Sequence, residues 1–176
     1  MKNIWIKYAL LFIILISGVT LDLMTKDCAK EDLKDHSVTV IENFFALSYV
    51  ENHAIAFGIL MNIPIAIRLP LIFLLTISST VLGFYIIWRL RYQKFRILLP
   101  FFVLLGGAYG NIVDRMQHGF VTDFFHLHYY NQYHFYVFNV ADVLVNIGII
   151  LIILQWKRFQ AVYDELFGDD AVIKTE

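Results

Sequence analysis

Long apolar segments constrain this chain more than any other feature of its sequence. Four stretches carry few charges, at about residues 4–23, 66–88, 97–114 and 139–157. A helix needs about 20 mostly apolar residues to cross roughly 30 Å of hydrocarbon. The pattern therefore predicts an all-α membrane protein with four transmembrane helices.

The composition excludes several other classes of protein. Hydrophobic residues make up 59% of the chain and charged residues 16%, whereas soluble domains have about 45–50% and 25%. The formal net charge of −1 offers no excess of cations for phosphate, so we expect no nucleic-acid partner. A single cysteine, Cys28, excludes an intramolecular disulfide, and we interpret it as an unmodified thiol rather than a lipidation site.

The distribution of lysine and arginine predicts the orientation in the membrane. These residues are concentrated in the amino-terminal tail, in the turn at 89–96 and in the carboxyl tail. By the positive-inside rule, both termini are cytoplasmic and the two larger connections face outward. The first segment could instead be a cleavable signal peptide, but no Ala-x-Ala site follows it. We expect a retained helix within one domain spanning 1–176, with a flexible acidic tail from about 164.

The two outward connections have different compositions. Residues 38–50 mix β-branched and aromatic side chains around a turn at Glu42–Asn43, which predicts a small extracytoplasmic β segment. Residues 120–138 contain nine phenylalanines and tyrosines. Such density suits the headgroup region of a bilayer, so we predict an aromatic-rich outer loop.

Uncommon polar residues collect at helix ends that meet at one membrane face. Asn52 and Asp123 lie in the two outward connections. The others are Asp22 and Lys26 at the end of the first segment, Asn111, Asp114 and Arg115 at the end of the third, and Asn139, Asp142 and Asn146 at the start of the fourth. Charges near hydrocarbon are costly, at about 2.5–3.5 kcal/mol each at the centre of a helix, so such a group indicates a functional site.

Asp123 and Asp142 are the strongest candidates for chemistry because neither has a basic residue three or four positions away. Two carboxylates in a poorly hydrated site cannot both ionise, so they share one proton. The ionised member can then take a proton from water, while the protonated member donates to a carbonyl oxygen. The sequence does not distinguish the acid from the base.

Simpler interpretations stay open for the other residues. Asp22 with Lys26, and Asp114 with Arg115, could be ion pairs that only mark helix ends. The acids could also relay protons in a small proton-coupled carrier, or cap the helices of a scaffold. Gly106 and Gly110 form a small-xxx-small pair that favours close helix packing. Four histidines, His118, His126, His128 and His134, could bind zinc, but their spacing matches no usual pattern.

Five blocks of sequence, taken in order, resemble the bacterial lipoprotein signal peptidases, also called signal peptidase II. They are Asp22-Leu-Met-Thr-Lys26, Asn52-His-Ala-Ile-Ala-Phe57, Gly106-Gly-Ala-Tyr-Gly-Asn-Ile-Val-Asp-Arg115, Val121-Thr-Asp-Phe124 and Phe138-Asn-Val-Ala-Asp142. The resemblance implies an aspartic endopeptidase of the bacterial inner membrane, with its site toward the outer face. Such an enzyme removes signal peptides from diacylglyceryl-modified prolipoproteins by cutting before the lipidated cysteine. It implies membrane lipid as surroundings, no metal or other cofactor, and we expect a monomer.

The resemblance also implies a role for each matching residue. Asp123 and Asp142 match the catalytic pair. Residues that line or brace the site would be Asn52, Asn111, Arg115 and Asn139, and those that support it would be Asp22, Lys26, Asp114 and Gly107. The chain departs from the family pattern at Glu51, at Ala54-Ile55 and at Tyr136, which affects loop shape but not the two aspartates.

Overall fold

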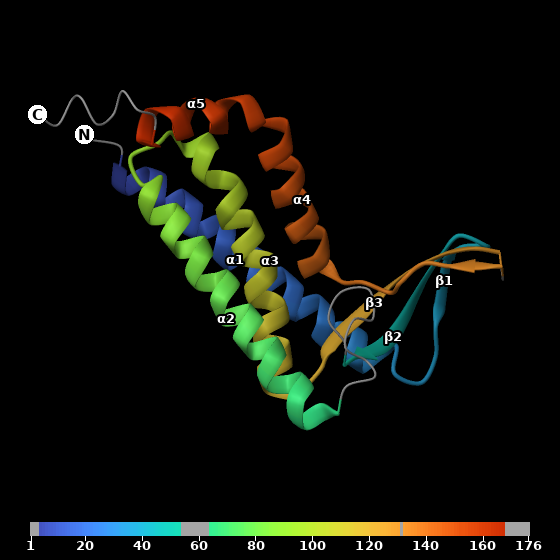
Figure 1. The fold of residues 1–176 in the computed structure, drawn as a ribbon. Coiled ribbons are helices and arrows are strands. Elements are labelled where there is room, and N and C mark those ends of the chain that lie inside the picture. Colours follow the sequence, from blue (N-terminus) through green and yellow to red (C-terminus); the bar gives the residue numbers. More distant parts are fainter. Residues whose placement is uncertain (1–3, 54–63, 131, 168–176) are drawn as a thin grey trace, which may run out of the picture.

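The computed structural model describes residues 4–53, 64–130 and 132–167. Its helices are α1 (Ile4–Asp32), α2 (Ile65–Arg89), α3 (Phe95–His118), α4 (Val140–Leu154) and α5 (Trp156–Phe167). Its strands are β1 (Val38–Ile41), β2 (Phe45–Asn52), β3 (Val121–Tyr129) and β4 (Tyr133–His134). The sheet lies beyond one end of the helices, and α5 lies at the other end (Figure 1).

Helix α3 occupies the centre of the bundle, where it packs against α1 and α4, while α2 packs mainly against α3. Glycines allow these close approaches. A Cβ on Gly106 would lie 3.3 Å from the carbonyl oxygen of Leu15 on α1, and one on Gly107 would collide with the carbonyl oxygen of Ala141 on α4. The packing role predicted for Gly106 is therefore confirmed.

Three helices, α1, α2 and α3, are long and apolar enough to span a membrane. Helix α4 reaches that length only together with α5, and the chain bends by 68° between them. The prediction of one helix over 139–157 is thus wrong at its end, because α4 stops at Leu154 and Gln155 is its C-cap. A helix of 15 residues is about 22 Å long, so the count of four spans stays a prediction.

The carboxyl end also differs from expectation. Residues 164–167 belong to helix α5 rather than to a flexible tail, because α5 is amphipathic and buries Val162 in the bundle core. The rest of the predicted tail, 168–176, lies outside the described residues, as do Ala54 and Ile55.

The four strands form one antiparallel sheet in the order β1-β2-β3-β4. The predicted hairpin at 38–50 is confirmed, and Asn43 adopts a positive φ of 59° in its turn. The prediction of an aromatic-rich loop is wrong over β3 and β4, which are strands. Aromatic and β-branched residues favour strands, and β2 offers β3 a partner for its backbone groups along the register from Phe45↔Leu127 to Asn52↔Val121.

Candidate active site

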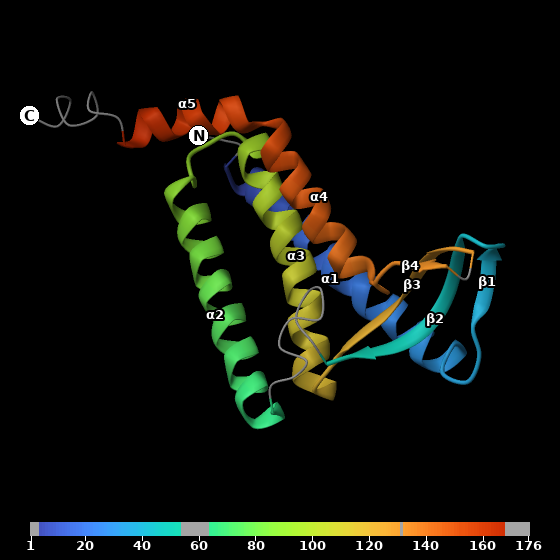
Figure 2. The same cartoon turned by 45° about the vertical axis from the view of Figure 1, so that its right-hand side comes forward.

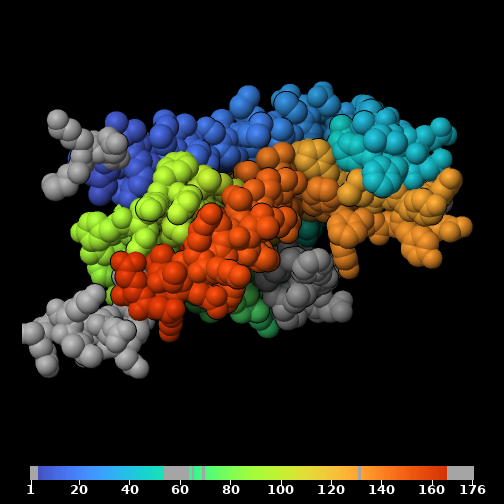
Figure 3. Space-filling model, turned by 90° about the horizontal axis from the view of Figure 1, so that it is seen from above, coloured from blue at the N-terminus to red at the C-terminus, as the bar shows by residue number. Residues whose placement is uncertain are grey.

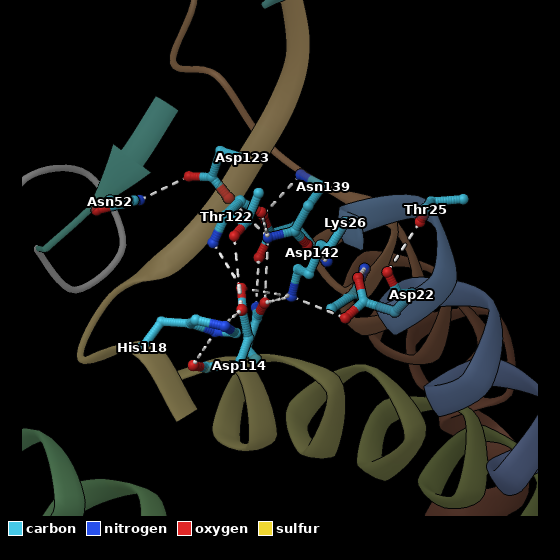
Figure 4. A network of polar contacts seen from close by, with 12 residues as sticks. Asp22, Thr25, Lys26, Asn52, Asp114, His118, Thr122, Asp123, Asn139 and Asp142 are labelled. Carbon is cyan, nitrogen blue, oxygen red and sulfur yellow. Dashed lines mark hydrogen bonds and ion pairs between the residues drawn. The ribbon is translucent and has the colours of Figure 1, made fainter. Parts of the chain in front are cut away.

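Asp123 lies near the start of β3, directly beyond the end of α3. Gly119 ends α3 in the left-handed conformation, with φ of 80°, which turns the chain into the strand. The Asp123 side chain is 2% exposed. Its Oδ1 accepts a hydrogen bond of 2.6 Å from Asn139 Nδ2, and its Oδ2 accepts one of 2.8 Å from Asn52 Nδ2 (Figure 4). Each carboxylate oxygen of Asp123 therefore accepts one hydrogen bond, and the two donors belong to different residues.

Asp142 lies in the first turn of α4, where local sequence fixes its position. Asn139 is the N-cap, and its Oδ1 accepts a bond of 3.0 Å from the backbone N–H of Asp142. In return, Asp142 Oδ2 accepts a bond of 3.1 Å from the backbone N–H of Asn139. This reciprocal arrangement is a capping box. The other oxygen, Oδ1, accepts a bond of 3.0 Å from Asn111 Nδ2 on α3.

Asn139 joins the two candidate acids. It is completely buried, its side-chain amide donates to Asp123, and its backbone donates to Asp142. Its Nδ2 also lies 3.1 Å from Asn111 Oδ1 and 3.2 Å from the carbonyl oxygen of Thr122. The structure thus brings both carboxylates, from β3 and from α4, within hydrogen-bond distance of a single residue.

Lys26 forms the centre of a second layer of polar contacts behind this pair. Its side chain is 1% exposed, and Nζ lies 2.7 Å from Asp22 Oδ2 and 2.7 Å from Asn111 Oδ1. Asp22 Oδ1 in turn accepts a bond of 2.7 Å from the backbone N–H of Ala141. This bond ties α1 to the residue that precedes Asp142.

Asp114 binds the backbone beside Asp123 in the same way as Asp22 binds the backbone beside Asp142. Its Oδ2 accepts a bond of 2.6 Å from the backbone N–H of Thr122, which precedes Asp123. The same oxygen lies 3.7 Å from Lys26 Nζ, while Oδ1 lies 3.1 Å from Lys30 Nζ and 2.9 Å from His118 Nδ1. Two buried aspartates therefore hold the backbone beside the two candidate acids.

The ion pairs predicted at the helix ends do more than mark those ends. The pair of Asp22 with Lys26 is confirmed, at 2.7 Å. Asp114 contacts two lysines of α1, Lys26 and Lys30, so it links two helices. The pairing of Asp114 with Arg115 stays a prediction.

Comparison with known proteins identifies the family. Residues 13–158 match the sequence model described as Signal peptidase (SPase) II. The chain belongs to the signal peptidase II family. A lipoprotein signal peptidase of Clostridium tetani is 36% identical over 81% of this chain and 88% of its own length. One of Syntrophotalea carbinolica is 38% identical over 86% and 93%.

Solved structures share the fold. Two are described as "Bacterial membrane enzyme structure by the in meso method", at 2.3 Å and 1.9 Å. They superpose with TM-scores of 0.70 and 0.69 at 26% and 27% sequence identity. They cover 85% and 84% of this chain, and 88% and 92% of their own. As a signal peptidase II, the chain is a membrane peptidase of the aspartic type.

In this signal peptidase II, the site residues that were predicted from the sequence lie together at the end of the helix bundle beside the sheet. Asn52, Asn111, Asn139, Asp22, Lys26 and Asp114 contact the two acids or their neighbours as described above. Arg115 on α3 carries a positive charge that acts on the carboxylates of both Asp123 and Asp142. Gly107 lies against the carbonyl of Ala141, so it sets how closely α4 approaches α3.

Three residues in this network of the signal peptidase II were not predicted to belong to it: Lys30, His118 and Thr122. Lys30 follows Lys26 by four positions and His118 follows Asp114 by four, so helical spacing was the signal that could have found them. Thr122 contributes through its backbone N–H and its carbonyl oxygen, which no side-chain pattern reveals.

Burial raises the pKa of Asp123 to about 7, and the negative charge of Asp142 also acts to raise it. Hydrogen bonds from Asn52 and Asn139 act in the opposite direction. A carboxyl group with this pKa is partly protonated near neutral pH.

The four histidines that were considered as zinc ligands lie in two separate places. His118 contacts Asp114, whereas His126, His128 and His134 lie together on β3 and β4, with His126 Nε2 3.2 Å from His134 Nδ1. Within the described ranges, no three His, Cys, Asp or Glu side chains are arranged to hold a metal ion.

Proposed function

We propose that this chain removes signal peptides from diacylglyceryl-modified prolipoproteins, cutting before the lipidated cysteine, with Asp123 and Asp142 activating the attacking water. The observation that carries the proposal is the position of Asn139, which binds both carboxylates at once. The names of the relatives, lipoprotein signal peptidases, support the substrate class. The same family match is why we do not propose a proton-coupled carrier.

Because the two carboxylates share one proton, one acts as the general base and the other as the general acid. The ionised carboxylate takes a proton from water, and the water oxygen forms a bond to the scissile carbonyl carbon. The protonated carboxyl donates its proton to the carbonyl oxygen, which gives a neutral tetrahedral diol. When the diol collapses, its hydroxyl proton returns to one carboxylate, the C–N bond breaks, and the nitrogen leaves with the proton first taken from water.

The surroundings of the pair support a lipidated substrate. A shallow, open apolar cavity of about 310 Å³ lies between the sheet and α4, lined by residues that include Phe44, Phe125, Phe138 and Val143. Val143 directly follows Asp142. We propose that this cavity receives an apolar part of the substrate while the scissile bond lies at the acids.

The orientation and organisation of the chain complete the proposal. Both termini lie in the cytoplasm, and the sheet and the acids lie at the outer face of the inner membrane, as the distribution of lysine and arginine predicts. The chain acts as one domain over 1–176 and as a monomer. A substrate anchored in the same membrane would reach the acids laterally.

A purified-protein assay with two peptides tests the proposed substrate. We expect cleavage before the cysteine of a peptide that carries a diacylglyceryl group. The same peptide without this group should be cleaved at least about 100-fold more slowly. The acyl chains make the free energy of partitioning into the membrane more favourable by roughly 0.8 kcal/mol per buried CH₂, which concentrates the substrate there. A strong chelator should leave the rate unchanged. Equal rates for the two peptides would disprove the lipid requirement, and loss of activity with chelator would disprove a site of aspartates alone.

The pH profile tests the shared proton. We expect kcat/KM to fall as the pH rises through about 7, because Asp123 then loses the proton that the pair needs to donate. The hydrogen bond from Asn52 lowers the pKa of Asp123, so Asn52→Leu should move this falling limb to higher pH. The expected displacement is roughly 0.5–1 pH unit, equivalent to a hydrogen bond of about 1 kcal/mol.

A matched control separates this effect from a general loss of polarity. Asn146→Leu makes the same change on α4, where the Asn146 amide donates to the backbone oxygen of Asp142 and leaves its carboxylate untouched. The falling limb should stay in place in Asn146→Leu. A limb that moves to lower pH in Asn52→Leu would contradict the assignment.

A further inference from the structure

A second cavity lies at the end of the bundle opposite to the acids. Its volume is about 740 Å³, and it lies between α2, α3 and α5. Its walls are largely apolar and include Ile86, Leu90, Phe101, Phe159 and Val162. The size and the chemistry of these walls suit a hydrocarbon chain.

The cavity is a consequence of how α2 and α5 pack. Helix α2 packs against α3. The ring of Phe159 on α5 packs edge to face on the ring of Phe101 on α3, with 5.7 Å between the two ring centroids. After the bend at Gln155, α5 lies across the helix ends beside the turn that joins α2 and α3 (Figures 2 and 3). The space between α2 and α5 therefore stays open at the level where the helices leave the membrane.

Aromatic residues lie around the opening between α2 and α5. Tyr85, Trp156 and Tyr163 line the cavity, and all three are more than half exposed. Tyrosine and tryptophan are enriched where hydrocarbon meets the headgroups. The cavity thus lies at the boundary between acyl chains and headgroups.

The end of the bundle that holds the cavity carries more basic than acidic residues. Lys7 belongs to this end, because its Nζ donates to the carbonyl oxygens of Arg91 and Gln93. The described basic residues at this end are Lys7, Arg89, Arg91, Lys94, Arg96, Lys157 and Arg158, and the described acidic residues are Asp164 and Glu165. Arg89 and Asp164 line the cavity itself, so an anionic group is expected on the α2 side, beside Arg89.

We propose that this cavity binds one anionic glycerophospholipid, with an acyl chain between α2 and α5 and the phosphate at Arg89. The proposal is independent of the peptidase chemistry. If the termini are cytoplasmic, as the proposed orientation has them, the lipid belongs to the cytoplasmic leaflet. The bound lipid fills space that the helices leave open, and so fixes α2 and α5 relative to each other.

Lipid retention in the full-length protein tests the headgroup. The protein is placed in bilayer discs of phosphatidylcholine with or without phosphatidylglycerol, released into detergent, and its bound lipid is counted by native mass spectrometry. We expect one retained phosphatidylglycerol and a reduction of about fivefold in its affinity in Arg89→Gln. Arg91→Gln is the matched control, because the Arg91 guanidinium lies over the rings of Trp88 and Tyr92 rather than in the cavity.

Equal retention in the two arginine variants, or equal retention of phosphatidylcholine and phosphatidylglycerol, would overturn the assignment.

Fluorescence quenching tests the acyl chain independently. The chain has three tryptophans, so replacing Trp5 and Trp88 by phenylalanine leaves Trp156 alone at the cavity. Phosphatidylglycerol with brominated acyl chains should quench Trp156 more strongly than brominated phosphatidylcholine does. Gln160→Phe, which fills the cavity from α5, should remove this difference. A protein that retains only Trp5, on the outer surface of α1, should be quenched equally by both lipids. Equal quenching of Trp156 by both, or a difference that survives Gln160→Phe, would overturn the proposal.

Discussion

We expect Asp123→Asn and Asp142→Asn each to lower the rate of prolipoprotein cleavage by about 10²- to 10⁴-fold or more. An amide cannot take a proton from water and cannot supply one to a carbonyl oxygen, so either change removes one half of the acid–base pair. The shapes of the side chains barely change, and the backbone bonds from Ala141 to Asp22 and from Thr122 to Asp114 do not involve the altered groups. The measurement is single-turnover cleavage of the lipidated peptide by protein in detergent or liposomes.

Asp27→Asn is the matched control for these two changes. Asp27 lies on α1 near the same end of the bundle, but its side chain is 73% exposed and its ion pair with Lys30 is long, at 3.9 Å. We expect Asp27→Asn to keep full activity. Circular dichroism and the thermal midpoint must show that the inactive variants are folded. Full activity in either folded variant would refute the proposed pair.

Lys26→Met is expected to destabilise the protein by about 3–5 kcal/mol, the usual cost of breaking a buried ion pair from one side. Methionine preserves much of the volume of lysine but leaves Asp22 and Asp114 without this cation in a buried site. Asn111 also loses the donor to its Oδ1 that lies 2.7 Å away. The change should appear in denaturant unfolding in detergent, and cleavage should fall because both backbone anchors loosen.

Two further variants show whether the loss arises from unpaired charge. Lys34→Met makes the same substitution at an exposed position and should change stability by less than about 0.5 kcal/mol. Adding Asp22→Asn to Lys26→Met removes one of the uncompensated charges. The double variant should therefore lose less stability than the sum of the two single changes. Additive losses, or a Lys26→Met protein as stable as Lys34→Met, would contradict the central role of Lys26.

Much of the site could be named from sequence because the family's motifs are short and local. Asp22-x-x-x-Lys26 and Asn139-x-x-Asp142 lie within single helical turns, so their spacing alone places each pair on one face or in one cap. Lys30 and His118 follow the same helical spacing but fall outside the matching blocks. The capping box at Asn139 needed both a helix start and its reciprocal bonds to be recognised.

Sequence alone was enough to predict most of the apolar helices, the β hairpin and most of the polar residues of the network, because hydropathy and motif spacing act over a few helical turns. The other features arise from tertiary packing. The pairing of β2 with β3 turned a predicted loop into a strand. The chain bends by 68° after α4, and α5 places Phe159 against Phe101 of α3. The bond from Ala141 to Asp22 joins residues 119 positions apart, and Asn139 meets Asp123 only because α3, α4 and the sheet converge. Such contacts depend on the register between elements distant in the chain, and no local pattern specifies that register.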